Sequence, residues 1–424
     1  MSLYPLSRRA FFAAAAGSTF LAHYRRLAAA ARNQLKIQDV RTMTIQGPSR
    51  TYLLVKVIAD DGTFGVAEAY GTPGIGVKEQ ILSLKQGLLG KDPLEIDAIF
   101  TFLDEHAKDL SGTRTDGSAH NLMRAASGIE MALWDLAGKA LGLPVYQLLG
   151  GKVRDRVRVY CDSGSREMIP GDEQSKARIQ QIQDLGFTAA KIDIDDADDP
   201  ARFDRVNWTA SNGEIDHMVA KVAFTRELYP RNFDLAVDMH ARYDVGTGKR
   251  VAREVEPFKL MFLEEPVPAE NIDAMRDVRE STSTPICCGE NVYLRWGFRE
   301  ILEKRAADII MPDLQKCGGL LEGRKIADLA HTYYVPVAPH AVTSPIGMMA
   351  TAHVCAAIPN FLAQEWHWID SLDHWRNWVK EGDILQKGYI TPPDRPGIGV
   401  EMNEDGARRA QVPGTPWFEP ATRS

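Results

Sequence analysis

The sequence has few cysteines, no surplus of basic residues and, after its first 31 residues, no long apolar run. The five cysteines are odd in number and form no CxxC pair, which argues against a disulfide framework and a zinc knuckle. The formal net charge is −7, whereas nucleic-acid binders usually carry a basic surplus. No apolar stretch after residue 31 approaches the roughly 20 residues that a membrane span requires. We therefore expect a soluble protein with no nucleic-acid partner and no membrane span.

The first 31 residues have the pattern of an export signal. Arg8 and Arg9 precede Phe11 and Phe12, and an alanine-rich stretch follows. The pattern resembles a twin-arginine signal, which exports proteins that have already folded, so we predict a periplasmic protein. A mis-called start codon, which would leave the protein in the cytoplasm, and a short amphipathic helix are the alternatives.

The segment from residue 35 to residue 150 reads as strands followed by helices. With 424 residues, 44% of them hydrophobic and 25% charged, the chain has ordinary globular composition. Apolar and polar residues alternate on both sides of Asp60-Asp61-Gly62, which indicates a β-hairpin. Residues 122–143 have a helical pattern. We predict a small α+β domain over residues 35–150.

After Gly150, short apolar strands alternate with amphipathic helices. Eight such alternations between residues 151 and 390 favour a (β/α) barrel over an open α/β sheet. The predicted strands end near Asp162, Asp193, His240, Glu264, Glu290, Asp313, His340 and Glu365.

The ionisable residues at these strand ends recur at regular intervals. From Asp238 to Glu365 the intervals are 26, 26, 23, 27 and 25 residues. In a parallel barrel the C-terminal strand ends meet at one rim, so these groups should share one pocket. Side chains at i and i+2 share a face of a strand, so Asp238 and His240 should both face the pocket while Met239 packs outward.

Three carboxylates on successive strands would repel one another in a pocket of low dielectric constant. A divalent metal neutralises such a set, and oxygen ligands alone favour a hard cation, so we predict one Mg²⁺ per subunit. A single acid at a strand end more often caps a helix or pairs with an arginine. Three acids in regular succession make that reading improbable: Asp238, Glu264 and Glu290.

Asp313 and His340, on the two following strands, form a candidate base. A carboxylate beside an imidazole fixes the orientation of the ring and makes it a better base. Next to a metal, such a pair suggests removal of a proton alpha to a carboxylate, with the cation stabilising the enediolate charge. His340 alone would more often be a structural histidine, but its interval from Asp313 favours the base.

Several segments resemble the enolase superfamily, in its mandelate racemase subgroup. The resemblance covers essentially the whole chain after residue 31 and implies an N-terminal capping domain over a modified (β/α)7β barrel, with residues 391–424 returning to the capping domain. The segments are LWDLAGKALGLPVYQLLGG (133–151), FLEEP (262–266), CGE (288–290), MPDLQKCGGL (311–320) and APH (338–340).

The resemblance also implies roles for site residues. Asp313 and His340 are expected to form the base dyad, and Glu365 is expected to donate a hydrogen bond to the substrate carboxylate. Glu365 must be protonated to donate such a bond, so its burial should raise its pKa. The metal is expected to bind the three carboxylates: Asp238, Glu264 and Glu290.

Two positions bear on the reaction type. Lysine-base relatives carry Lys-x-Lys on the second barrel strand, whereas this chain has Lys191 and then Asp193, which speaks against two-base racemisation. We predict that Lys191 and Asp193 bind the substrate; an ion pair between them is the alternative. The Asp-x-His at Asp238 and His240 resembles the galactonate dehydratase-like acid-sugar dehydratases. In those enzymes the histidine is a general acid, although His240 could instead support Asp238.

These features predict a Mg²⁺-dependent dehydratase that converts a sugar acid into a 2-keto-3-deoxy acid. His340 would take the C2 proton and His240 would protonate the departing 3-hydroxyl. An epimerase or cycloisomerase acting through the same enediolate is one alternative, and a non-catalytic periplasmic binder of acidic sugars is another. Residues 44–52 and 70–78 are candidate specificity loops, and we expect a homo-oligomer.

Overall fold

The computed structural model describes residues 34–71, 76–111, 117–163, 168–202, 204, 206–415 and 417–418, without the side chains of residues 107–119. The predicted export signal therefore lies outside the described residues. Within the part of the chain that the structure describes, no helix combines the length and apolar character needed to cross a membrane.

The N-terminal region is a three-stranded antiparallel sheet covered by helices. Its strands are β1 (Ile37–Gln46), β2 (Thr51–Ala59) and β3 (Phe64–Ala69), in the order β1-β2-β3. The predicted hairpin is confirmed, because β2 pairs with β3 and Gly62 lies in the turn with φ 88°, a conformation that favours glycine. The helices are α3 (Val77–Leu88), α4 (Ile96–Ser111), α5 (Gly117–Leu141) and the short α6 (Val145–Leu148).

The helix predicted over residues 122–143 is α5, which packs against β3 and β2. It also packs against α3 and α4 of the same region and against α12 (Gly319–Thr332) of the second region. Trp134 on this helix is fully buried, as are Ile129 and Leu133. Burial on so many sides explains why the helix is apolar over most of its circumference.

The second region alternates parallel strands with helices. Strands β4 to β9 pair consecutively and in parallel, and β10 returns to pair with β4. In chain order the elements are β4 (Val157–Asp162), α7 (Glu173–Asp184), β5 (Ala189–Asp193), α8 (Asn212–Leu228), β6 (Asp234–Asp238), α9 (Val245–Glu254), η1 (Glu256–Phe258), β7 (Phe262–Glu264), α10 (Ile272–Arg279), β8 (Ile286–Cys288), α11 (Leu294–Glu303), β9 (Ile309–Ile310), α12 (Gly319–Thr332), α13 (Pro345–Ala357) and β10 (Gln364–Trp366).

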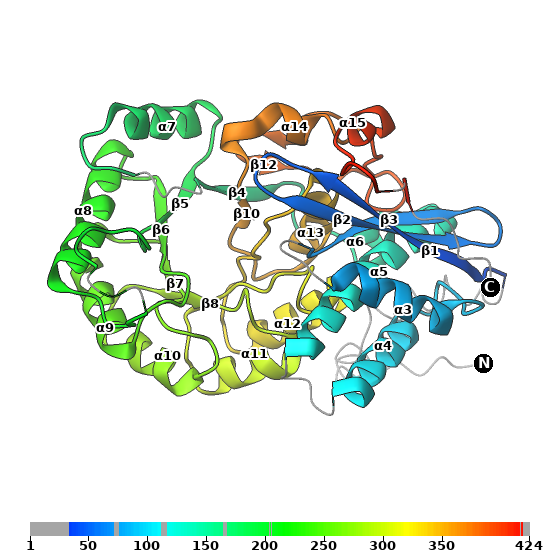
Figure 1. The fold of residues 1–424 in the computed structure, drawn as a ribbon, viewed down its shortest axis with the longest axis horizontal. Helices are drawn as coiled ribbons and strands as arrows, with labels where there is room; N and C mark the ends of the chain where they lie inside the picture. The colour runs from blue at the N-terminus through cyan, green and yellow to red at the C-terminus, as the bar shows by residue number, and fades with distance from the viewer. Residues whose placement is uncertain are drawn as a thin grey trace, which may run out of the picture.

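These strands form a barrel-like domain with helices outside, on the left of Figure 1. The continuous ladder stops at β9. Single parallel bridges then join Ile310 to Val337 and Val337 to Phe361, which lies just before β10. The predicted (β/α)7β order of elements is therefore present, with the seventh strand reduced to one bridged residue. A separate apolar cluster, with members on or next to each strand position, lies among them: Tyr160, Ala189, Ala236, Phe262, Cys287, Ile309, Met311, Ala338 and Ala363.

The C-terminal segment leads from the barrel-like domain to the edge of the N-terminal sheet, as the orange and red ribbon in Figure 1 shows. It contains η2 (Ile369–Ser371), α14 (Leu372–Arg376), β11 (Leu385–Gln386), β12 (Tyr389–Ile390) and α15 (Glu404–Arg409). Strand β12 pairs with β4. Beyond α15, the amide of Val412 donates to the carbonyl of Thr44 on β1 at 3.1 Å.

Buried polar side chains of the N-terminal region accept hydrogen bonds from backbone amides of the barrel-like domain. Glu130 on α5 accepts from the amides of Leu320 and Leu321 at 2.8 and 3.0 Å, and Ser127 accepts from the amide of Gly318. These amides belong to the first turn of α12 and to the residue before it, and such groups have no partner within a helix. A side chain of one region therefore caps a helix of the other.

The two glycines of the sequence CGGL make this capping possible. Gly318 and Gly319 have φ values of 124° and 91°, which side chains rarely allow. A Cβ atom on Gly319 would lie 2.0 Å from Oε2 of Glu130. Substitution of Gly319 would therefore displace Glu130 from the helix terminus.

His353 on α13 joins three segments. Its Nδ1 accepts from the amide of Tyr146 on α6 at 3.0 Å, and its Nε2 donates to the carbonyl of Ile398 at 2.9 Å. These partners require the neutral ring with its proton on Nε2. We call the region where His353 and Glu130 make these contacts the cap–barrel interface.

Candidate active site

The C-terminal strand ends bring four carboxylates around one lysine. Nζ of Lys191 on β5 lies 2.6 Å from Glu264 and 3.0 Å from Glu365, and 3.2 Å from both Asp162 and Asp238. These acids end β4, β6 and β7 or lie in β10, so the shared rim predicted from the spacing is confirmed for them. The sequence left open an ion pair between Lys191 and Asp193. Among the described residues, Lys191 forms ion pairs with the four acids above and not with Asp193.

The lysine neutralises only part of this negative charge. Burial lowers the pKa of Lys191, but the neighbouring carboxylates, Glu264 first, raise it well above its ordinary value, so the side chain stays charged. Burial and the charge of Asp238 raise the pKa of Glu264 well above its ordinary range. Oε1 of Glu264 is buried and has no hydrogen-bond partner among the described residues. A carboxylate cluster with excess negative charge and an orphaned oxygen fits a divalent cation.

Two groups of described side chains could hold such an ion. One consists of Asp193, Asp238 and His240, and in each group the potential ligand atoms lie within 4.8 Å of one another. The other group consists of Asp162, Glu365 and His367. Asp193 therefore lies beside Asp238 and His240, and burial together with Asp162 raises its pKa to about 7, while its role in substrate binding stays a prediction.

Glu290 points toward a different partner from Asp238 and Glu264. Its Oε2 lies 2.8 Å from Nε2 of His340, and its Oε1 accepts from Nδ2 of Asn291 at 2.7 Å. The charge of Glu290 nevertheless contributes to the raised pKa of Glu264, so the two groups share one electrostatic environment. The set of Asp238, Glu264 and Glu290 as the metal ligands stays a prediction.

The expected base pair is present. Nδ1 of His340 lies 2.8 Å from Oδ2 of Asp313, and both side chains are buried. Nε2 of the ring faces Glu290 at 2.8 Å and Glu365 at 3.6 Å. Burial lowers the pKa of His340, but Glu365 and Glu290 raise it well above its ordinary value. The ring is therefore protonated unless these negative charges are neutralised.

The expected protonation of Glu365 is wrong. Burial by itself raises its pKa, but the positive charges of His340 and Lys191 and a hydrogen bond from His367 hold the pKa well below its ordinary range. Burial alone would raise the pKa, but three cationic or protonatable groups converge on this side chain. These neighbours favour the ionised form of Glu365, which accepts hydrogen bonds instead of donating them.

His240 lies near Asp238, but the two residues do not share a face of one strand as the alternation predicted. Strand β6 ends at Asp238, and His240 lies beyond it with φ 47°, outside the extended region. Its Nε2 still lies 3.6 Å from Oδ2 of Asp238. Met239 is fully buried in the main apolar core, as the alternation predicted.

Sequence reasoning assigned no role to several residues of the site. Asp162 was predicted only as a strand end, although its position matched that of the assigned acids. His367 follows Glu365 by two residues, and its Nε2 lies 3.2 Å from Glu365 and 3.3 Å from Asp162. Asp195 lies in the loop after β5, and nothing in its local pattern distinguishes it from the other acids of that loop.

A group of basic side chains surrounds Tyr70 near the base pair. Nζ of Lys316 lies 4.3 Å from the centre of the ring, and the guanidinium carbons of Arg50 and Arg124 each lie 5.2 Å from it. Lys316 also lies 3.8 Å from Asp313. Arg50 and Tyr70 belong to the predicted specificity segments, of which residues 72–75 lie outside the described residues.

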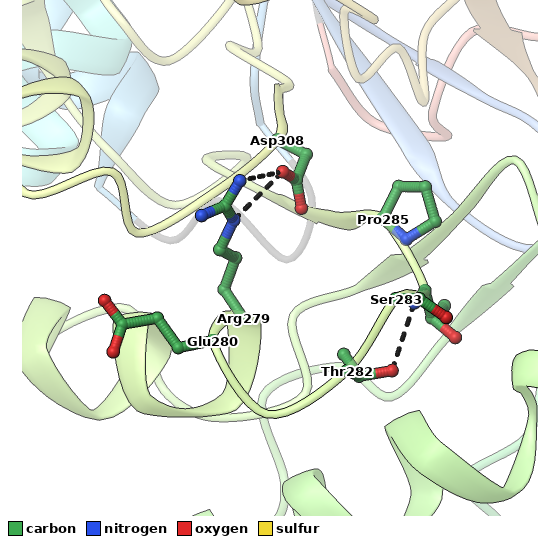
Figure 2. Close-up of a pocket in the computed structure, with 7 residues that line it drawn as sticks. Arg279, Glu280, Thr282, Ser283, Pro285 and Asp308 are labelled. Atoms are coloured by element: carbon green, nitrogen blue, oxygen red, sulfur yellow. Dashed lines mark hydrogen bonds and ion pairs between the residues drawn. The ribbon is translucent and has the colours of Figure 1, made fainter.

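A cavity of about 480 Å³ lies elsewhere, beside the N-terminal ends of β8 and β9 (Figure 2). Asp308 there accepts from Nε and Nη2 of Arg279 at 3.0 and 2.7 Å, so the guanidinium is already paired. None of the predicted site residues lines this cavity, whose residues are Arg279, Glu280, Thr282, Ser283, Thr284, Pro285 and Asp308.

Comparison with known proteins identifies the family. Residues 31–150 match the N-terminal domain of mandelate racemase and muconate lactonizing enzyme, and residues 174–406 match the enolase C-terminal domain-like family. The chain belongs to the mandelate racemase group of the enolase superfamily. This confirms the resemblance drawn from the sequence motifs.

Members of this family with assigned names are similar over nearly their whole length. The chain is 42% identical to D-xylonate dehydratase of Haloferax volcanii over 385 residues, 91% of each chain. It is 33% identical to D-galactonate dehydratase of Xanthomonas oryzae over 91% of this chain and 97% of that enzyme. The crystal structure of a mandelate racemase/muconate lactonizing enzyme-like protein from Rubrobacter xylanophilus, 41% identical, superposes with a TM-score of 0.83 over 90% of this chain and 100% of that one.

Proposed function

We propose that this protein is a Mg²⁺-dependent lyase that removes water from a sugar acid, an aldonic acid similar to xylonate or galactonate. One observation carries the proposal: two imidazoles, His240 paired with Asp195 and His340 paired with Asp313, both lie beside the carboxylate cluster. His240 follows β6, the third strand position, and His340 follows the seventh. Elimination of water needs one group that takes a proton and one that gives a proton. The relatives named as dehydratases support the same reaction.

The two histidines would divide the proton transfers. His340, held at Nδ1 by Asp313, would remove the proton from C2 of the substrate through Nε2. His240 would protonate the 3-hydroxyl, which leaves as water. The C2–H and C3–O bonds break, a C2–C3 double bond forms, and the enol product rearranges to a 2-keto-3-deoxy acid. The overall change is the loss of one water molecule.

The acids of the rim would bind the metal, and Lys191 would hold the substrate carboxylate. We assign Asp238, Glu264 and Glu290 as the metal ligands. Mg²⁺ bound there would stabilise the negative charge that develops on the substrate carboxylate. The negative charges of Glu290 and Glu365 must also be offset before His340 can accept a proton, which supports a cation site beside them. The basic groups around Tyr70 would attract an anionic substrate.

The test is turnover of a sugar-acid library that includes xylonate and galactonate stereoisomers. We expect at least one acid to give a 2-keto product that reacts with semicarbazide. Activity should vanish with EDTA and return with Mg²⁺. Deuterium entry at C2 in D₂O without a keto product would show an epimerase instead. Saturable binding without turnover of any stereoisomer would show a sugar-acid binder.

We also propose that the protein is exported to the periplasm and forms a homo-oligomer. The first proposal rests on the twin-arginine pattern of residues 7–12 and the second on the resemblance to the family. Cell fractionation of the full-length chain, compared with an Arg8→Lys, Arg9→Lys variant, tests export, because the variant should stay in the cytoplasm. Sedimentation equilibrium of the purified protein tests assembly.

A further inference from the structure

His240 is held in place by a residue of the loop that follows the preceding strand. Nδ1 of His240 lies 2.8 Å from Oδ1 of Asp195, in the loop between β5 and α8. The other carboxylate oxygen of Asp195 lies 2.8 Å from Nη1 of Arg242. The side chain of Asp195 is fully buried, whereas that of His240 is 39% exposed. The ring is therefore anchored at Nδ1, and Nε2 is left facing the site.

The backbone around His240 is fixed in an unusual conformation. His240 and Ala241 have φ values of 47° and 56°, a region that is strained for a residue with a side chain. The amide of His240 donates to Oδ1 of Asp238 at 2.7 Å, and the amide of Ala241 donates to the carbonyl of Glu265 at 2.8 Å. Strain of this kind persists where the surrounding contacts hold it, and it accumulates at functional sites.

We propose that Asp195 is a positioning residue for the proposed elimination. It accepts a hydrogen bond from Nδ1 of His240 and thereby directs Nε2 toward the C3 side of the bound substrate. The inference rests on the proposed function. It assigns to the second histidine a carboxylate partner comparable to the Asp313 of the first, and each of these acids lies a few residues beyond the end of a strand, Asp195 after β5 and Asp313 after β9.

The same loop supplies the aspartate of a second aspartate–histidine pair, which lies outside the site. Nδ1 of His217 on α8 lies 2.9 Å from both carboxylate oxygens of Asp199. The His217 side chain is 50% exposed. In each pair an aspartate of this loop lies 2.8–2.9 Å from Nδ1 of a histidine, and the pairs differ in whether the histidine reaches the carboxylate cluster. Asp199→Ala therefore controls for damage to the loop.

The experiment compares wild type, Asp195→Ala, Asp195→Asn and Asp199→Ala on a sugar acid that wild type dehydrates and on its 3-deoxy-3-fluoro analogue. Fluoride leaves without needing a proton from a general acid, so its release reports on C2 deprotonation alone. We expect Asp195→Ala to slow dehydration about 100-fold while fluoride release stays within about threefold of wild type. Deuterium entry at C2 of unreacted substrate in D₂O should persist.

The conservative variant and the control sharpen the result. Asp195→Asn should recover part of the dehydration rate, because its amide oxygen can still accept from Nδ1 of His240. Asp199→Ala should change none of the readouts by more than about threefold. The inference is overturned if Asp195→Ala dehydrates at the wild-type rate, or slows fluoride release and C2 exchange as much as dehydration. If wild type dehydrates no sugar acid, the proposed function fails instead.

Discussion

Two fully buried glutamates, Glu264 at the rim of the barrel-like domain and Glu130 at the cap–barrel interface, differ in how their charge is satisfied. Burial is the main cause of the raised pKa in both, to about 7 for Glu130 and well above the ordinary range for Glu264. The two oxygens of Glu130 accept from Leu320, Leu321 and the indole of Trp134. Glu264 shares Lys191 with three other acids and keeps one oxygen without a partner among the described residues.

The difference separates a structural acid from a functional one. Every contact of Glu130 is made within the folded chain, so its polar groups stabilise the fold. The negative charge around Glu264 is only partly neutralised, and one of its oxygens has no partner among the described residues. Residues of this kind are common at sites that bind a cation or substrate. A buried acid with a raised pKa is therefore informative only together with its hydrogen-bond partners.

Glu264→Gln should give the largest effect and the clearest contrast in activity. Removing one of the cluster's negative charges should lower turnover about 1000-fold, because a charged ligand of the proposed metal site is lost. In EDTA the same change should raise the free energy of unfolding by about 1 kcal/mol, because it relieves repulsion among buried carboxylates. Steady-state kinetics and urea unfolding measure the two quantities. A variant that is less stable in EDTA and fully active would contradict the comparison.

Glu130→Ala should lower stability and leave turnover almost unchanged. It leaves two helix amides and the indole of Trp134 without their acceptor, so we expect the free energy of unfolding to fall by about 4 kcal/mol. Glu130→Gln, which retains one acceptor oxygen, should cost about half as much. Turnover per folded molecule should stay within about twofold of wild type.

A surface acid supplies the control for these unfolding measurements. Glu300 forms an ion pair with Lys304 on α11 at 2.9 Å, and its side chain is 52% exposed. Glu300→Ala should change the free energy of unfolding by less than about 0.5 kcal/mol. A loss for Glu130→Ala no larger than this control would show that the helix cap contributes little.

His353 should make the cap–barrel interface sensitive to acid. Burial lowers its pKa from 6.5 to about 4 in the folded chain. The unfolded chain therefore binds a proton that the folded chain excludes, and stability is lost as the pH falls through this window, by up to about 3 kcal/mol. Urea unfolding between pH 7.5 and 4 measures the slope. His353→Gln should show a shallower slope, and equal slopes would exclude this histidine as the cause.

Much of the fold and part of the site could be predicted from the sequence. The hairpin at Gly62, the helix α5 and the strands ending at Asp162, Asp193 and Glu264 lie where the patterns placed them. These features depend on local periodicity and turn chemistry, which the sequence displays directly. The recurrence of acids at strand ends also predicted that distant carboxylates would meet.

The charge states and orientations within the site could not be predicted in this way. The pKa of Glu365 is lowered because His340 and Lys191, both distant in the chain, lie beside it, and Glu290 faces His340 instead of Glu264. The partnership of His240 with Asp195 depends on how the residues that follow β5 and β6 lie relative to each other. None of these facts has a local signature, since each is a distance between residues far apart in the chain.

The sequence by itself determined where the barrel strands and helices alternate, with strand ends placed to within a few residues, because the spacing of strand and helix follows from short-range preferences and apolar patterning. Only the tertiary structure decided which of the residues at the strand ends share a charge, an orphaned oxygen or a hydrogen bond. Electrostatic and hydrogen-bond energies depend steeply on separation and burial, and these quantities exist only once the chain has folded.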